Sequence, residues 1–254
     1  MSGTSSLIVL SAAILALTPL LWRLAGSAPA ALLPIPFVVA WLLTAGRWAQ
    51  ARDPWAGVTA GAVLGLGLYS SVASAVMMPV YLALTVAIFS YGRVAPWRQL
   101  VLCVAAFAVT AAPFAASWLS HPDQLREVIK AHHLYDTDRF SILQGIKEMA
   151  SWVGLTARSE VYWDYFNPAF LFLTGGVLLP PLLVLLPAGL FRMVRDQPSP
   201  LTQLLLAGFA VAPLAASLTA EAPVPGRILF LTPFAAVISA LGLQYLLTLT
   251  KRSR

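Results

Sequence analysis

Long apolar segments recur from one end of this 254-residue chain to the other, and they restrict its fold more than any other feature. Hydrophobic residues make up 59% of the sequence and charged residues only 10%, whereas about 25% of a soluble domain is charged. Such segments are typical of transmembrane helices, in which the backbone satisfies its own hydrogen bonds. We therefore predict an all-α, polytopic membrane bundle with eight transmembrane helices at residues 6–22, 30–46, 55–70, 74–91, 99–118, 169–191, 201–219 and 227–249. The third segment is short, so it and the fourth form either two tilted helices or a partly re-entrant pair.

Lysine and arginine in the short loops predict the orientation, because these residues are enriched on the cytoplasmic side. One side holds nine of them: Arg47, Arg52, Arg93, Arg98, Arg192, Arg195, Lys251, Arg252 and Arg254. The short loops of the other side hold Arg23 and Arg227. We expect both termini in the cytoplasm, with an outer loop at 119–168 between five helices in 1–118 and three in 169–254. The net charge of +6 follows from this anchoring, so it does not indicate a nucleic-acid partner.

The outer loop carries two helical patterns of its own. Pro122 suits the first turn of a helix, and Asp123 places a negative charge where the helix dipole favours it. A second amphipathic helix is expected over residues 138–153. Helices of this kind lie on the membrane surface or cap the spans.

Glycine spacing predicts a close helix contact. Gly57, Gly61 and Gly65 recur every four residues and form a smooth stripe on the third segment, which another helix can approach closely. The histidines predict no metal site: His132 and His133 are adjacent, so on a helix they point about 100° apart, and no zinc-ligand spacing accompanies them. They are either a solvated or interfacial pair, or one of them contacts a lipid phosphate. No cofactor is expected from these patterns, and a divalent cation is left open.

Two arginines and an aromatic–acidic cluster are the candidate binding residues. Arg23 and Arg227 lie in outer short loops, either to bind an anionic group or to reach lipid headgroups. Glu221, six residues before Arg227, is its candidate ion-pair partner. The cluster at 160–166 is either part of the aromatic belt at the membrane boundary or a site for a sugar or lipid phosphate. Its candidate ligand-binding residues are Tyr162, Asp164 and Tyr165.

Three ordered motifs, spread over roughly residues 6–249, resemble a known family. They are Gly65-Leu-Gly-Leu-Tyr-Ser-Ser with Met78-Pro79, Tyr165-Phe-Asn-Pro-Ala-Phe-Leu-Phe-Leu-Thr-Gly, and Ala220-Glu-Ala-Pro-Val-Pro-Gly-Arg followed by Leu231-Thr-Pro-Phe. Together they are similar to motifs of bacterial polytopic glycosyltransferases of the GT-C type. These enzymes are relatives of the protein O-mannosyltransferases and of the lipid A aminoarabinose transferase.

The resemblance implies a protein of the bacterial inner membrane that uses a polyprenyl-phosphate-sugar lipid as donor. It implies an inverting transfer in which a carboxylate deprotonates the acceptor hydroxyl while cations hold the leaving phosphate. By this resemblance, Arg227 first and Arg23 second would be the cations that hold the leaving phosphate. Two residues depart from the motifs: Ala75 or Val76 stands near the usual arginine of the first, and Gly176 replaces the Asp that ends the second.

A third departure concerns catalysis. Such enzymes keep their catalytic carboxylate in the first outer loop, and residues 25–30 contain no acidic residue. The resemblance therefore implies a truncated product, one part of a split enzyme whose other chain carries the missing N-terminal spans, or a non-catalytic relative. We expect this chain alone to be inactive as a transferase. A non-catalytic membrane scaffold or assembly partner is the rival hypothesis. A transporter is disfavoured because the spans contain no charged residue for a coupling ion.

Overall fold

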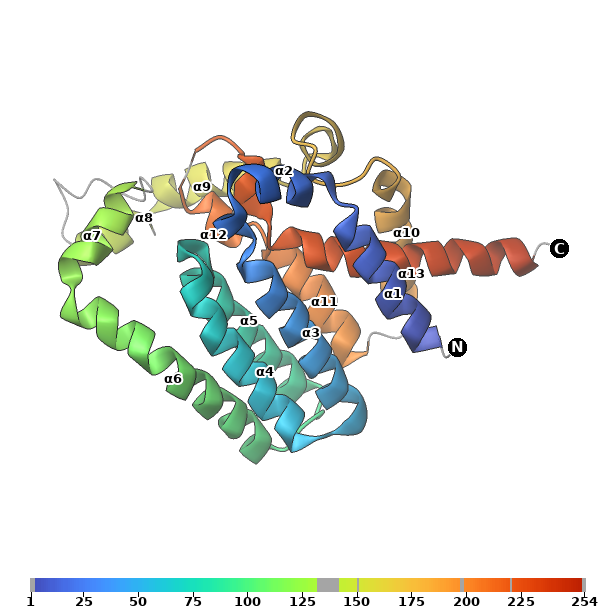
Figure 1. Cartoon of the computed structure of the whole chain (residues 1–254), viewed down its shortest axis with the longest axis horizontal. Coiled ribbons are helices and arrows are strands. Elements are labelled where there is room, and N and C mark those ends of the chain that lie inside the picture. Colours follow the sequence, from blue (N-terminus) through green and yellow to red (C-terminus); the bar gives the residue numbers. More distant parts are fainter. Residues whose placement is uncertain (1–2, 132–141, 150, 197–198, 220, 253–254) are drawn as a thin grey trace.

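The computed structural model describes residues 3–131, 142–149, 151–196, 199–219 and 221–252, and these parts of the chain are helical, with no strand (Figure 1). The α-helices are α1 (Gly3–Ala16), α2 (Pro19–Ser27), α3 (Pro34–Ala51), α4 (Pro54–Gly67), α5 (Val72–Tyr91), α6 (Trp97–Ser120), α7 (Pro122–Ala131), α8 (Ile142–Met149), α9 (Trp152–Asp164), α10 (Leu182–Arg195), α11 (Pro200–Val211), α12 (Leu214–Ser217) and α13 (Leu231–Arg252). Shorter turns are η1 (Pro29–Leu32), η2 (Leu68–Ser70), η3 (Phe170–Thr174, a π-helical turn) and η4 (Pro225–Ile228). The predicted all-α class is confirmed.

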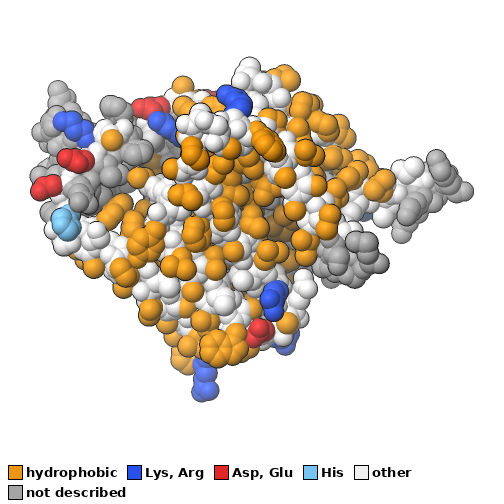
Figure 2. All heavy atoms as spheres, viewed as in Figure 1, with side chains coloured by type: hydrophobic (Ala, Val, Ile, Leu, Met, Phe, Trp, Pro, Cys, Tyr) orange, Lys and Arg blue, Asp and Glu red, His pale blue; other side chains and the backbone are white. Residues whose placement is uncertain are grey.

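Five helical segments in the described residues are long and apolar enough to cross a membrane: Pro29–Ala51, Val72–Tyr91, Trp97–Ser120, Pro200–Ser217 and Leu231–Thr250. A sixth crossing results if Ser6–Ala16 and Pro19–Ser27, which are bent by 51°, count as one broken span. Hydrophobic side chains cover most of the visible face of the molecule (Figure 2). The chain is therefore an integral membrane protein. The span predicted at 6–22 is bent between α1 and α2, and two other predicted spans differ from the structure. The segment predicted at 55–70 holds α4, which is 14 residues long.

The other difference lies at 169–191, where the prediction of one continuous span is wrong. The turn η3 ends at Thr174, Gly175 follows it, and Gly176 then adopts a left-handed conformation with φ of +55°. Pro180 and Pro181 follow, and α10 begins only at Leu182. A glycine without a Cβ accepts this backbone turn, and prolines lack the N–H that would continue a helix. The glycine and the two prolines break the helix, and the apolar composition of the segment gives no sign of this break.

The spans form two groups that meet at α13. Helices α3, α4, α5 and α11 lie side by side, while α13 crosses them and packs against α1 and α10 (Figure 1). Trp41 of α3 and Tyr81 of α5 stack with ring centroids 4.7 Å apart, and both rings contact Phe234 of α13. The α3–α4 and α5–α6 connections lie at one end of the bundle. Helices α2 and α9 and the turn η4 lie at the opposite end, called here the α9 end (Figure 1).

The predicted glycine contact is confirmed as the α4–α6 crossing. A Cβ built on Gly61 would overlap the carbonyl oxygen of Cys103, and one on Gly65 would overlap the hydroxyl of Thr110. Gly57 instead lies against a tryptophan ring of α3. The glycine stripe therefore packs against two helices, α3 and α6. The backbones of α4 and α6 come into direct contact because the glycines place no side chain between them.

A tyrosine hydroxyl bridges two backbone groups of α6 beside the proline that interrupts its hydrogen bonding. Pro113 lies inside α6 and lacks the N–H of a regular helical bond. The hydroxyl of Tyr69 donates to the carbonyl oxygen of Thr110 (3.0 Å) and accepts from the backbone N–H of Phe114 (3.0 Å). The Tyr69 hydroxyl thus stands between two groups that would bond directly in an uninterrupted helix.

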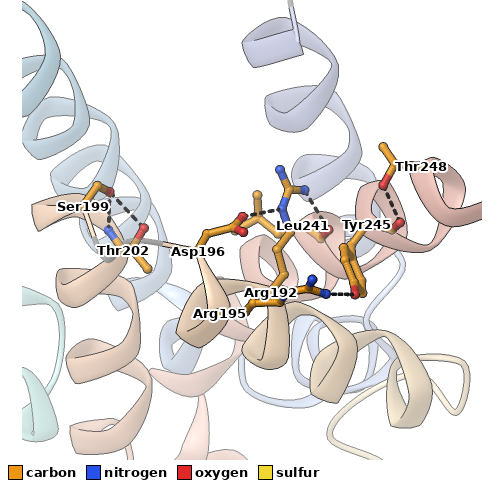
Figure 3. Close-up of polar contacts among 8 residues, drawn as sticks. All are labelled: Arg192, Arg195, Asp196, Ser199, Thr202, Leu241, Tyr245 and Thr248. Atoms are coloured by element: carbon orange, nitrogen blue, oxygen red, sulfur yellow. Dashed lines mark hydrogen bonds and ion pairs between the residues drawn. The ribbon is translucent and has the colours of Figure 1, made fainter. Parts of the chain in front are cut away.

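The α10–α13 crossing is equally close. A Cβ on Gly189 would overlap the carbonyl oxygen of Ile238, and one on Gly242 would overlap that of Leu185. Polar contacts flank this crossing near the end of α10 (Figure 3). There Arg192 donates to the carbonyl oxygen of Leu241 (3.2 Å) and pairs with Asp196 (3.5 Å), while Arg195 donates to the hydroxyl of Tyr245 (3.4 Å).

Three helices occupy the described parts of the predicted outer loop. Helix α7 begins at Pro122 with Asp123 in its first turn, as predicted. The predicted helix over 138–153 differs: α8 ends at Met149, and α9 begins at Trp152 with the side chain of Ser151 accepting from the N–H of Gly154. A serine at this position satisfies a free N–H of the new helix and so starts it. His132 and His133 lie outside the described residues.

Candidate functional site at the α9 end

Three segments that lie far apart in the sequence meet at the α9 end. Arg23 of α2 donates to the carbonyl oxygen of Gly175 (3.2 Å), the last residue of the second motif. Helix α2 also contacts η4, where a Cβ on Gly226 would lie 3.7 Å from the side chain of Leu24. The hydroxyl of Tyr165 accepts from the N–H of Val224 (3.2 Å). The structure therefore gathers most of the predicted site into one assembly.

Arg227 is held by two neighbours. One terminal nitrogen donates to the hydroxyl of Thr219 (2.7 Å), and the other pairs with a carboxylate oxygen of Glu221 (2.7 Å). Both members of the ion pair are partly exposed, with side-chain exposures of 31% for Arg227 and 41% for Glu221. The expected Arg227–Glu221 ion pair is therefore present. Two of the five N–H groups of the guanidinium are used, which fixes its plane and leaves donors for a ligand.

Arg23 is more open than Arg227. Its side chain is exposed, it donates to the carbonyl oxygen of Gly175, and no acidic group among the described residues pairs with it. The neighbouring Gly176 has a positive φ, and a Cβ built there would lie 3.5 Å from a terminal nitrogen of Arg23. The backbone at Gly175, beside the turn at Gly176, thus holds this guanidinium through one hydrogen bond, and its exposed side chain has further donors for a ligand.

Tyr165 lies beneath the assembly. Its side chain is fully buried, and its ring packs edge-on against Phe170 with centroids 5.6 Å apart. Burial raises the pKa of the Tyr165 hydroxyl; the N–H of Val224 and the charge of Arg227 oppose this rise, and the charge of Glu221 adds to it. Tyr165 therefore holds in place the backbone segment that carries Arg227, and its own ring and hydroxyl are already engaged by other residues of the protein.

Tyr162 and Asp164 belong to α9. The Tyr162 hydroxyl donates to the carbonyl oxygen of Ala210, and its ring packs against Phe166, which in turn contacts Phe209 of α11. Asp164 is exposed at the end of α9, and no described residue forms a hydrogen bond or ion pair with its carboxylate. Tyr162 thus fastens α9 to α11, and Asp164 is the one open carboxylate among the candidates.

Two further residues were missed by the sequence reasoning. Thr219, which is buried, orients Arg227 from eight residues upstream. Arg158 of α9 donates to the carbonyl oxygens of Leu218 (3.0 Å) and Gly154 (3.0 Å). Burial lowers the pKa of Arg158, and the charge of Glu148 opposes this. Neither residue has a spacing or motif that would single it out, because the contact of Thr219 depends on how α12 and η4 meet and that of Arg158 on how α9 and α12 meet.

The described side chains of the site are suited to anion recognition. No group of three or more His, Cys, Asp or Glu residues that could hold a metal ion occurs among the described residues. Two guanidinium groups and one open carboxylate are present instead. Guanidinium groups in fixed planes bind phosphate or carboxylate oxygens through paired hydrogen bonds. Comparisons with protein-family models, curated proteins and solved structures found no match.

Proposed function

We propose that this chain is the C-terminal membrane portion of a glycosyltransferase that takes a sugar from a polyprenyl-phosphate donor. The observation that supports this most is the meeting of α2 with the second and third motif segments at the α9 end, with Arg23 and Arg227 on contacting elements. A donor lipid of this kind carries its phosphate at the membrane boundary, where both arginines are expected. The acceptor would be bound at the same face.

In this proposal the arginines stabilise the leaving group. A carboxylate takes the proton of the acceptor hydroxyl, the hydroxyl oxygen attacks the anomeric carbon, and the bond from that carbon to the phosphate oxygen breaks. The negative charge that develops on the phosphate is balanced by Arg227 and Arg23. This chain supplies the arginines that bind the phosphate. The carboxylate that acts as base comes from spans carried by another chain or by a longer product.

We further propose that the protein lies in a bacterial inner membrane with both termini cytoplasmic and the α9 end outside. The nine lysines and arginines of the opposite loops and termini support this orientation. Helix α4 lies beside α3 and packs along α6, which supports a short, tilted crossing at 55–70 (Figure 1). A crossing by α10 completes an arrangement of eight.

The second candidate is a non-catalytic scaffold of the same architecture. One observation favours it: Glu221 and Thr219 already partner Arg227, so this arginine needs no ligand to be satisfied. The two candidates differ in what Glu221 does. In the transferase its charge competes with a phosphate for Arg227, and in the scaffold it only completes an ion pair.

Donor-lipid binding separates the candidates. We expect Arg227→Ala to weaken binding of a polyprenyl-phosphate lipid by about 1.5–3 kcal/mol, the range for a hydrogen bond to a charged group. Arg227→Lys should recover part of this loss, because lysine keeps the charge and lacks the planar fork. Glu221→Gln should strengthen binding, because it keeps an accepting oxygen and removes the competing charge. Affinities are measured in one detergent for all variants.

The matched control is Arg98→Ala, which removes an exposed arginine at the opposite end of the bundle. It should leave donor-lipid affinity unchanged. Equal affinities for wild type, Arg227→Ala, Arg227→Lys and Glu221→Gln would favour the scaffold.

A further inference from the structure

Helix α9 has two faces of different character. Its protein-facing side reaches the broken segment α11–α12 through Arg158, which contacts Leu218, and Tyr162, which contacts Ala210. Its other side exposes Trp152 at the first turn (84%) and Trp163 at the last turn (67%). Residues eleven apart lie on the same face of a helix. The two exposed indoles therefore mark the ends of one outward stripe.

The contacts of α9 fix how deep each end lies. Leu218 lies just beyond Pro200–Ser217, one of the apolar segments long enough to span a membrane. Ala210 lies seven residues before the end of that segment, which corresponds to about 10 Å along a helix. Arg158 is thus level with the end of the span, and Tyr162 is level with its interior. Phe166, one turn after Tyr162, contacts Phe209 at a centroid distance of 5.6 Å and continues this descent.

The outward stripe suits a lipid boundary better than water or a protein partner. Tryptophan concentrates at membrane–water boundaries because its ring is apolar and its N–H is polar. Helices that lie in this region are buried about 5–10 Å into the headgroup–acyl boundary, a depth comparable with the level of Ala210. Thr156 and Ser159, which are exposed between the two indoles, are compatible with headgroups.

We propose that α9 is a tilted interfacial helix whose outward stripe lies in the lipid headgroup–acyl boundary, with Trp163 deeper in the membrane than Trp152. The partner is the lipid surface itself. The tilt follows from the two contacts with α11–α12, and it places the adjoining Tyr165 and Arg227 assembly at the membrane boundary. This inference is independent of any transferase activity.

Spin labels on single cysteines test the proposal in the full chain reconstituted into phosphatidylcholine–phosphatidylglycerol vesicles. Cys103 is the only native cysteine, so Cys103→Ala provides a background without thiols. Labels replace Trp152, Thr156 and Trp163, and collision rates with oxygen and with a water-soluble nickel chelate give the depth of each. Val109, an exposed position within the span of α6, is the control for full lipid exposure, and Glu148 is the control for water.

We expect the oxygen-to-nickel collision ratio to increase from 152 through 156 to 163 by several-fold in total, between the values of the two controls. A value at 163 equal to that at 148 would place the stripe in water and overturn the proposal. Low collision rates with both reagents would show a protein on this face and overturn it as well, as would a label at 152 deeper than one at 163.

A second measurement needs no cysteine. Brominated lipids quench tryptophan fluorescence at the depth of the bromine atoms, and the difference between the native chain and Trp163→Phe isolates the emission of Trp163. The Trp152→Phe variant isolates Trp152 in the same way. We expect stronger quenching of Trp163 than of Trp152 by bromine placed in the acyl chains. Equal quenching of the two indoles would contradict the tilt.

Discussion

Two helix crossings in this protein use the same physical device and leave different traces in the sequence. At the α4–α6 crossing, Gly61 and Gly65 of one helix meet the backbone of α6. At the α10–α13 crossing, each helix supplies one glycine, Gly189 and Gly242. In both places a Cβ would overlap a carbonyl oxygen of the opposing helix. The contact is the same, but only the first crossing has its glycines at a regular spacing on one helix.

Between apolar helices in a membrane, close backbone approach replaces the hydrophobic effect as the source of association. Lipid tails are as apolar as the side chains, so helix association depends on van der Waals contact and on hydrogen bonds between helices. Each crossing adds polar contacts of this second kind. Tyr69 reaches into α6 beside Pro113, and Arg192 reaches the carbonyl oxygen of Leu241 on α13.

Adding a methyl group at either crossing should give the largest effects. We expect Gly61→Ala and Gly242→Ala each to lower the free energy of unfolding by about 2 kcal/mol, within the range for an overpacked site. The cause is overlap with the carbonyl oxygens of Cys103 and Leu185, which are backbone atoms that no side-chain rotation can move aside. Unfolding in mixed micelles of increasing denaturing-detergent content measures these changes.

Cys103 reports which crossing has opened. Its thiol is fully buried at the α4–α6 crossing, so Gly61→Ala should increase its labelling rate with a maleimide. Gly242→Ala should leave the rate unchanged. Gly26→Ala is the matched control, because nothing lies within 4 Å of a Cβ there and alanine favours a helix over glycine. If Gly26→Ala destabilises as much as Gly61→Ala, close backbone contact is not the source of stability.

The sequence predicted the helical class, the apolar segments and the stripe on α4 because each has a regular local pattern. It did not predict the α10–α13 crossing, because one glycine on each of two helices has no spacing to detect. The break after η3 was missed for a related reason. Gly176, Pro180 and Pro181 interrupt a segment whose average composition still resembles a span.

The candidate site shows the same limit. The pairing of Glu221 with Arg227 was anticipated because both residues lie in one short segment. The burial of Tyr165 and the contact of Arg158 with Leu218 depend on how α9 rests on α12, which no local pattern specifies. Tyr165 was selected as a ligand-binding residue from its aromatic and acidic neighbours, and its hydroxyl instead holds the backbone of Val224.

The polar contact at the α4–α6 crossing should have an intermediate effect. Tyr69→Phe keeps the ring that packs edge-on against Phe114 and removes the hydroxyl between Thr110 and Phe114. The freed carbonyl oxygen and N–H then lose their partner, so we expect a loss of about 1 kcal/mol in the free energy of unfolding. The same detergent titration measures it. Tyr91→Phe is the control, because Tyr91 is 87% exposed at the end of α5. Equal stability for Tyr69→Phe and wild type would show that Pro113 is tolerated without this bridge.

The smallest effect is expected from the ion pair beside the α10–α13 crossing. Asp196 directly follows α10, one turn after Arg192, and its Oδ2 lies 3.5 Å from the Nε of Arg192; the Asp196 side chain is 67% exposed. Exposed pairs of this kind contribute roughly 0.3–0.5 kcal/mol and are screened by salt. Asp196→Asn should therefore change the free energy of unfolding by less than about 0.5 kcal/mol. The difference should shrink further at high ionic strength, while the effect of Gly242→Ala persists there. If Asp196→Asn instead cost as much as Gly242→Ala, the Arg192 side chain that Asp196 positions against Leu241, rather than backbone contact alone, would hold α10 to α13. The two crossings would then differ in mechanism as well as in sequence pattern.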